Sequence, residues 1–199
     1  MERVLFIDAC MRGPELSRTH RLCRRFLAEY TALRPDTQVI HRDLSRCDLP
    51  LLTGELAQQR GNWGADHPLL APAREVAAAD LILVGAPYWD LAFPAALKVY
   101  LEWASTLGIT FRYEEDGRQV GLSRARALVY CTTAGGPLEG QNFGFDYVKA
   151  LGAMLGVPEA HCLAAQGLDI WGADPEAILA RTEQEAAALA QRLRQKALS

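Results

Sequence analysis

Long apolar runs and clusters of like charge are both missing from this sequence of 199 residues. No run approaches the roughly 20 apolar residues that span a bilayer, so we expect no membrane partner. The formal net charge of −3 provides no basic surface for nucleic acid, and we expect no nucleic-acid partner. Residues 1–7 enter an apolar strand without a signal-like hydrophobic region, which predicts a cytoplasmic protein. A small-molecule ligand is the remaining expectation.

Several motifs that would reveal a site are also absent. The five cysteines never have C-x-x-C spacing, which indicates neither a disulfide framework nor a zinc site, and we expect buried or half-buried thiols. The four histidines lack ligand-like spacing, so the sequence predicts no metal. Neither G-x-G-x-x-G nor G-x-x-x-x-G-K-[ST] occurs, which removes the main support for a Rossmann dinucleotide site or a P-loop. A triad of Ser17, His20 and Asp8 is disfavoured because no G-x-S-x-G elbow is present.

What the sequence does contain is an alternation of strand and helix patterns. Half of the residues are apolar, which is enough for one good core. Five strands alternating with five helices predict an α/β fold, a single domain over residues 1–199 with a doubly wound parallel sheet and helices on both faces. The strands are expected over 4–8, 37–42, 81–86, 125–131 and 160–165, and the helices over 18–34, 72–79, 97–107, 147–155 and from 175 onward.

Two segments interrupt this alternation. Residues 43–67 are irregular apart from a helix expected over 52–59, and a loop of this length in a compact domain is more often a functional cover than a connector. Residues 108–122 look like a small excursion with a turn at Asp116-Gly117. Leu33 is expected to complete the apolar face of the first helix, before Pro35.

Three loops should meet at the carboxyl edge of the sheet, where open α/β folds bind ligands. The loop over 8–19 ends in a helix start with hydroxyls and arginines, which favours a phosphate. The loop over 87–91 offers the flat rings of Tyr88 and Trp89, and Gly135-Gly136 allows the main chain to approach a ring edge. A phosphate at one end and a flat ring at the other describe a mononucleotide such as FMN.

Each of these features also has an ordinary explanation. Ser17 alone is more often only a helix cap, Tyr88 and Trp89 could be rim packing, and Gly135-Gly136 is most often only a turn. The stronger indication is their placement after the first, third and fourth strands, because all three then lie at one edge of the sheet.

Five ordered motifs make the sequence resemble the flavodoxin-like FMN-dependent NADH:quinone oxidoreductases, the azoreductase family, over nearly the whole chain. Residues 86–91 with Leu97-Lys98-x-Tyr100 are similar to the family's A-P-M-Y-N-F-x(5)-L-K-x-Y pattern. Residues 108–113 with Gly117 resemble G-V-T-F-R-Y-x-x-x-G, and residues 133–136 resemble S-R-G-G. Arg42-Asp43-Leu44 and Ala165-Gln166-Gly167 are similar to R-D-L and A-E-G.

The resemblance implies roles for particular residues. Cys10 and Ser17-Arg18-Thr19 would occupy the phosphate and ribityl positions of FMN. Residues Pro87, Tyr88, Trp89, Asp90 and Leu91, together with Thr133, Ala134, Gly135 and Gly136, would hold the isoalloxazine. The family is homodimeric with each site at the subunit interface, so Tyr113 is expected near the flavin, with Phe143 and Trp63 as aromatic candidates for the substrate pocket.

The resemblance also implies the reaction. NADH or NADPH would pass a hydride to FMN and leave, and a quinone or azo compound would then take two electrons in a ping-pong sequence. The cofactor carries this chemistry, so no catalytic side chain is expected. The alternatives are a one-electron carrier of flavodoxin type, which normally has a T-x-T-G-x-T loop that is absent here, and a cofactor-free binding module.

Three departures from the family pattern bear on the cofactor. Asp90 stands where the family usually has Asn, and a carboxylate beside a flavin that gains negative charge should disfavour its reduced form. Cys10 replaces a serine and Ala134 an arginine, and both changes remove polar contacts. We therefore expect a lower flavin potential, or a changed electron acceptor, and weaker FMN affinity than in relatives.

Overall fold

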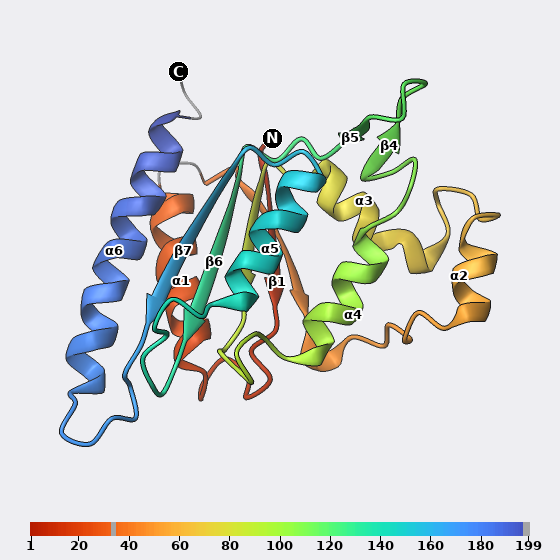
Figure 1. Ribbon diagram of the computed structural model, residues 1–199. Coiled ribbons are helices and arrows are strands. Elements are labelled where there is room, and N and C mark those ends of the chain that lie inside the picture. The colour runs from red at the N-terminus through yellow and green to blue at the C-terminus, as the bar shows by residue number, and fades with distance from the viewer. Residues whose placement is uncertain (33–34, 197–199) are drawn as a thin grey trace.

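The computed structural model describes residues 1–32 and 35–196, and its centre is a five-stranded parallel sheet in the order β2-β1-β3-β6-β7 (Figure 1). This is the flavodoxin-like order, and the prediction of a five-stranded parallel sheet with helices on both faces is confirmed. The strands of the sheet are β1 (Arg3–Asp8), β2 (Gln38–Asp43), β3 (Leu81–Gly85), β6 (Ala127–Thr133) and β7 (Glu159–Ala165). The helices are α1 (Arg18–Ala32), α2 (Gly54–Arg60), α3 (Ala71–Ala78), α4 (Ala95–Ala104), α5 (Phe143–Met154) and α6 (Pro175–Lys196).

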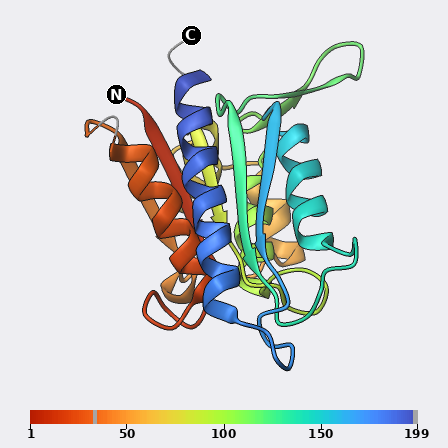
Figure 2. The ribbon, with the colours of Figure 1, turned by 90° about the vertical axis from the view of Figure 1, so that its left-hand side faces the viewer.

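Alternate residues of the central strands face opposite layers, because successive side chains of a strand point to opposite sides. Phe6 and Leu83 contribute to the core that α1 and α6 cover, whereas Ile7 and Val84 contribute to the core beneath α3, α4 and α5. Figure 2 shows these layers, with α1 and α6 on one side of the strands and α5 on the other. Burial on both faces explains why β3 is a continuous apolar run without alternation.

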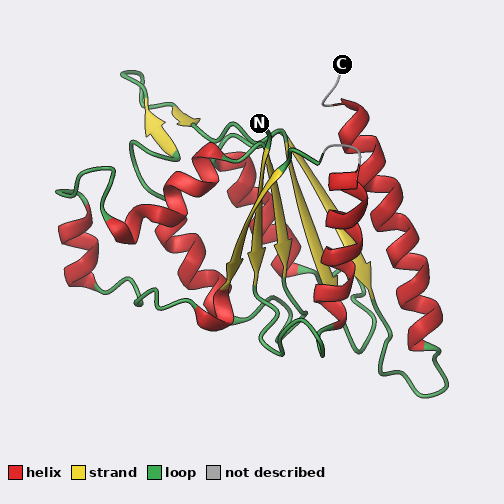
Figure 3. Cartoon of the chain, turned by 180° about the vertical axis from the view of Figure 1, so that it is seen from behind, coloured by secondary structure: helices red, strands yellow, loops and turns green. Residues whose placement is uncertain are grey.

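The carboxyl ends of all five strands lie at one edge, where Figure 3 shows the connecting loops gathered below the arrowheads. The convergence expected from the sequence is therefore present. No helix among the described residues is long and apolar enough to cross a membrane.

Several boundaries differ from the sequence-based expectation. Strand β6 runs to Thr133 and is buried throughout, so Thr132 and Thr133 belong to the strand and not to the loop that follows it. The apolar run that predicts the strand ends at Cys131, whereas pairing with β7 continues as far as Thr133 opposite Ala165. Helix α4 ends at Ala104 instead of near Leu107. Leu33 lies outside the described residues.

The segment 43–67 contains the expected helix, displaced slightly to Gly54–Arg60, and it packs beside α4. The Trp103 indole donates to the carbonyl of Pro50 at 2.7 Å, and Arg60 Nη1 donates to the carbonyl of Glu102 at 3.0 Å. These two hydrogen bonds attach the segment to α4.

The excursion over 108–122 forms an antiparallel hairpin of β4 (Phe111–Tyr113) and β5 (Gln119–Gly121). Its expected turn is confirmed, with Gly117 at φ +81°. The hairpin lies toward the edge of the sheet opposite the loops (Figure 3). Gly121 holds its base against the end of α5, because a Cβ on Gly121 would meet the backbone of Leu155 and Gly156 at 2.1 Å.

This contact generates a stability prediction. Gly121→Ala should lower the free energy of unfolding by about 1–3 kcal/mol, since neither β5 nor the end of α5 can move away from the added methyl group. The control is Gly54→Ala, where the new Cβ meets no heavy atom within 4 Å. Denaturant titration of both variants gives the comparison, and equal stability of Gly121→Ala and the wild type would contradict it.

Candidate functional site

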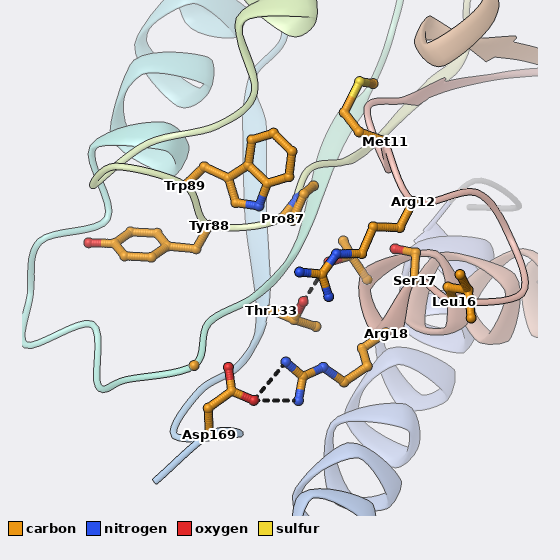
Figure 4. Close-up of a pocket in the computed structure, with 12 residues that line it drawn as sticks. Met11, Arg12, Leu16, Ser17, Arg18, Pro87, Tyr88, Trp89, Thr133 and Asp169 are labelled. Atoms are coloured by element: carbon orange, nitrogen blue, oxygen red, sulfur yellow. Dashed lines mark hydrogen bonds and ion pairs between the residues drawn. The ribbon is translucent and has the colours of Figure 1, made fainter.

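A cleft of about 250 Å³ opens at the carboxyl edge of the sheet (Figure 4). Four loops supply its walls, those that follow β1, β3, β6 and β7. Pockets for small molecules typically measure ~300–1,000 Å³, so one chain forms a partial enclosure. The lining residues are Met11, Arg12, Leu16, Ser17, Arg18, Thr19, Pro87, Tyr88, Trp89, Thr133, Gly135 and Asp169.

One end of the cleft is cationic and rich in hydrogen-bond donors. Ser17 caps α1, with its Oγ accepting the backbone N–H of His20 at 3.1 Å, so the hydroxyl serves the helix start and not a nucleophile–base pair. The N–H groups of the first helical turn face this end and favour an anion. In the described chain Arg12 has no ion-pair partner, and Figure 4 shows its guanidinium directed into the cleft.

Arg18 is the second cation, and it is already paired. Its Nη1 and Nη2 atoms both donate to Asp169 Oδ1 at 3.0 Å, across the mouth of the cleft between α1 and the loop after β7 (Figure 4). The Asp169 side chain is 65% exposed and that of Arg18 is 34% exposed, so solvent screens the pair and an incoming anion can exchange with the carboxylate.

The floor of the cleft is fixed by a buried contact between two elements. The hydroxyls of Thr19 on α1 and Thr133 at the end of β6 lie 2.6 Å apart and share a hydrogen bond. The backbone N–H of Tyr88 donates to the carbonyl of Thr133 at 3.0 Å, which ties the loop after β3 to the same strand end. The cationic and aromatic ends are therefore held at a fixed separation.

The aromatic end is built by Tyr88 and Trp89. The Tyr88 hydroxyl donates to the carbonyl of Gln141 at 2.8 Å, while Trp89 remains 41% exposed. Trp89 and Ala92 exchange two backbone hydrogen bonds around a tight turn whose central residues have positive φ, 49° at Asp90 and 68° at Leu91. Asp tolerates this region, but a leucine there is strained, and such strain persists only where the surroundings hold the loop.

Five of the residues expected at the cofactor lie beside the cleft without lining it. Cys10 is buried with its thiol directed at the carbonyl of Gly85, and burial raises the pKa of that thiol well above its ordinary value, so it is an inert neutral group. Asp90 and Leu91, in the tight turn that follows Trp89, do not line the cleft, and Ala134 is buried with its backbone N–H donating to the carbonyl of Ala165. Gly136 supports the wall by accepting the N–H of Gly167.

The three residues expected in the substrate pocket are not brought together within one chain. Tyr113 is on β4, at the opposite edge of the sheet, and is 59% exposed. Trp63 stacks on His67 with ring centroids 3.9 Å apart, in a separate hollow beside α4. Phe143 begins α5 near Gln141 and is 54% exposed, but it does not line the cleft.

Three lining residues, Met11, Leu16 and Asp169, lie outside the set selected from the sequence, whereas Arg12 is one of the two arginines expected at the phosphate end. Met11 and Leu16 belong to the loop already identified, and a loop that wraps an anion site could have indicated them. Asp169 could not be found in this way, since it follows β7 and reaches the cleft only because its N–H donates to the carbonyl of Gly135 at 2.9 Å.

Comparison with known proteins agrees with this geometry. A family model described as having the flavodoxin-like fold matches residues 2–192. An FMN-dependent NADH:quinone oxidoreductase 2 of Clostridium acetobutylicum is 34% identical in an alignment of 194 positions, which covers 94% of this chain and 96% of the relative. An FMN-dependent NADH:quinone oxidoreductase of Coprothermobacter proteolyticus is 33% identical over 199 residues, covering 96% and 98%.

The likeness extends to solved structures. The crystal structure of an azoreductase from Bacillus anthracis matches with a TM-score of 0.85 and 24% identity, covering 96% of this chain and all of the other. At that identity the match establishes the fold alone. The family match and the two relatives go further, and by them this chain belongs to the flavodoxin-like family that includes the FMN-dependent NADH:quinone oxidoreductases.

Proposed function

We propose that this protein is an FMN-dependent NADH:quinone oxidoreductase that also reduces flat azo compounds. One observation carries the proposal: a single cleft joins a cationic, hydroxyl-bearing end to an aromatic end, at the sheet edge where this fold binds ligands. The two relatives named above support it, because their names state this activity. NADPH is the alternative hydride donor.

The donor set fits a mononucleotide. Ser17, Arg18 and Thr19, with Arg12 opposite, would hold the phosphate by charge and by the N–H groups of the α1 terminus. Tyr88 and Trp89 would contact the ring system, with Pro87 shaping the turn between strand and ring. Gly135 leaves room for the Asp169 side chain beside the cleft, because a Cβ at this position would lie 2.4 Å from Asp169 Oδ2.

When bound, FMN supplies the two-electron chemistry, accepting a hydride from NADH and passing the electrons to the quinone. The chain contributes position. The Thr19–Thr133 contact and the backbone hydrogen bond from Tyr88 to Thr133 keep the phosphate and ring ends at one spacing, and Trp89 would cover part of the ring. The reaction requires no acid or base from a side chain.

We also propose that the working unit is a cytoplasmic homodimer. The cleft of one chain is small and open, and the aromatic groups expected over the flavin are solvent-exposed elsewhere on the same chain. A second copy that brings Tyr113 and Phe143 to the cleft would complete the enclosure and bury both rings. Trp63, held against His67, would contribute only from the rim of such an interface.

The absorption spectrum of the purified protein tests the function directly. We expect flavin bands, gained or enhanced on adding FMN, that bleach on anaerobic addition of NADH and return on adding a quinone. A flavodoxin-type carrier would keep its bands when NADH is added. A cofactor-free module would show no bands and no FMN binding, and either result would overturn the proposal.

The pair between Arg18 and Asp169 generates a prediction on affinity. Arg18→Ala should weaken FMN binding about tenfold, the lower end for a hydrogen bond to a charged group. Asp169→Asn should tighten it about two- to fivefold, because the carboxylate no longer competes with the phosphate for Arg18. Fluorescence titration of FMN measures both. Arg181→Ala, at an exposed position of α6, is the matched control, and opposite signs in the two test variants are the decisive result.

Asp90 generates a prediction on redox potential. Asp90→Asn removes a negative charge beside the ring end, so it should raise the two-electron potential of bound FMN, by about 30 mV for a ~1.4 kcal/mol interaction. Potentiometry on the holoenzyme measures the shift. Glu185→Gln, at an exposed position of α6, should leave the potential unchanged. An unaltered potential in Asp90→Asn would rule out this role for the carboxylate.

A further inference from the structure

Three potential metal ligands meet beneath the loop that follows β1. Asp8 ends β1, His20 lies in the first turn of α1, and His41 lies on β2. One ligand atom from each residue lies within 4.8 Å of the other two. Asp8 Oδ2 is 3.0 Å from His41 Nε2 and 3.5 Å from His20 Nε2. The cluster is separate from the cleft, because none of the three residues lines it.

His20 is buried, being only 6% exposed, yet the protein does not satisfy its imidazole. Its Nδ1 has no hydrogen-bond partner in the part of the chain that the structure describes, and its Nε2 lies 3.5 Å from Asp8 Oδ2. A neutral imidazole has one unprotonated nitrogen, whose lone pair can bind a metal ion. The Nε2 atom of His20 faces Asp8 and is therefore the nitrogen that this cluster offers to an ion.

We propose that Asp8, His20 and His41 bind a divalent transition-metal ion, with zinc as the best match. Two imidazoles and one carboxylate suit zinc, cobalt or nickel, whereas magnesium and calcium prefer a shell of oxygens alone. Three protein ligands leave a fourth position for water. This site does not depend on the function proposed above.

Two of the three spacings between ligand atoms are close to what zinc requires, and the third, between the two histidine nitrogens, is at most 4.8 Å. Bonds of ~2.0–2.1 Å in a tetrahedral site place ligand atoms about 3.4 Å apart. The distance from Asp8 to His20 already matches this value, and the distance from Asp8 to His41 must lengthen by a few tenths of an ångström. The His41 side chain is 46% exposed, so a hydrated ion can enter from solvent and the ring can adjust.

The second oxygen of Asp8 connects this site to the cleft. Asp8 Oδ1 accepts the backbone N–H of Cys10 at 3.0 Å, at the start of the loop that continues to Ser17. His20 donates its own backbone N–H to Ser17 Oγ. An ion held by Asp8 and His20 would therefore brace both ends of the loop proposed to hold the FMN phosphate.

Zinc binding to the full-length protein tests the proposal. The protein is stripped with a chelator, which is then removed, and zinc chloride is titrated by calorimetry. We expect one equivalent per chain. Loss of a partner that only orients a ligand lowers metal affinity about 10–100-fold, so loss of a ligand in His41→Asn or His20→Asn should cost at least tenfold.

His161→Asn is the matched control, because His161 also pairs with a carboxylate, Glu159 at 3.3 Å, but has no second histidine beside it. Its zinc affinity should equal that of the wild type. His41→Asn is the decisive variant since this half-exposed position tolerates the change, and circular dichroism confirms that it folds. Absence of saturable binding in the wild type, or unchanged affinity in a folded His41→Asn, would overturn the proposal.

Discussion

The need to cover both faces of a parallel sheet determines the rest of this structure. The strands β1, β3 and β6 are apolar on both sides, and the cores beneath α1 with α6 and beneath α3, α4 and α5 exclude water from each face. Only the ends of the strands remain for polar chemistry. The groups that line the cleft therefore come from strand ends, from the loops that follow them and from the first turn of α1, and the strands set their positions.

This constraint explains how much the sequence could predict. Burial is indicated by the unbroken apolar run over 81–85 and by the helical spacing of Leu97, Tyr100 and Leu101. Strand, helix and fold class therefore follow from the pattern. The boundaries depend on pairing partners. Nothing local to Thr132 and Thr133 shows that β7 continues beside them, and the strand end was therefore placed two residues too early.

The candidate site was predictable to the extent that it is local. Ser17, Arg18 and Thr19 mark a helix start, and Tyr88 and Trp89 mark a loop, and the structure brings both into one cleft. Asp169 enters through a backbone bond to Gly135, and the cluster of Asp8, His20 and His41 through the register of β1 with β2. Contacts between segments so distant along the chain leave no spacing pattern to read. The residues expected over the flavin, Tyr113, Phe143 and Trp63, do not line the cleft of the single chain.

The pairing of Arg18 with Asp169 affects how the binding of a phosphate would depend on ionic strength. Arg18 never passes from a fully hydrated state to a bound one, because an internal anion occupies it first. Binding is then an exchange of one anion for another, and dissolved salt screens both pairings. The two screening effects oppose each other, so the contribution of Arg18 to phosphate affinity depends only weakly on ionic strength. The salt dependence of phosphate binding would then come mainly from Arg12, which has no ion-pair partner in the described chain.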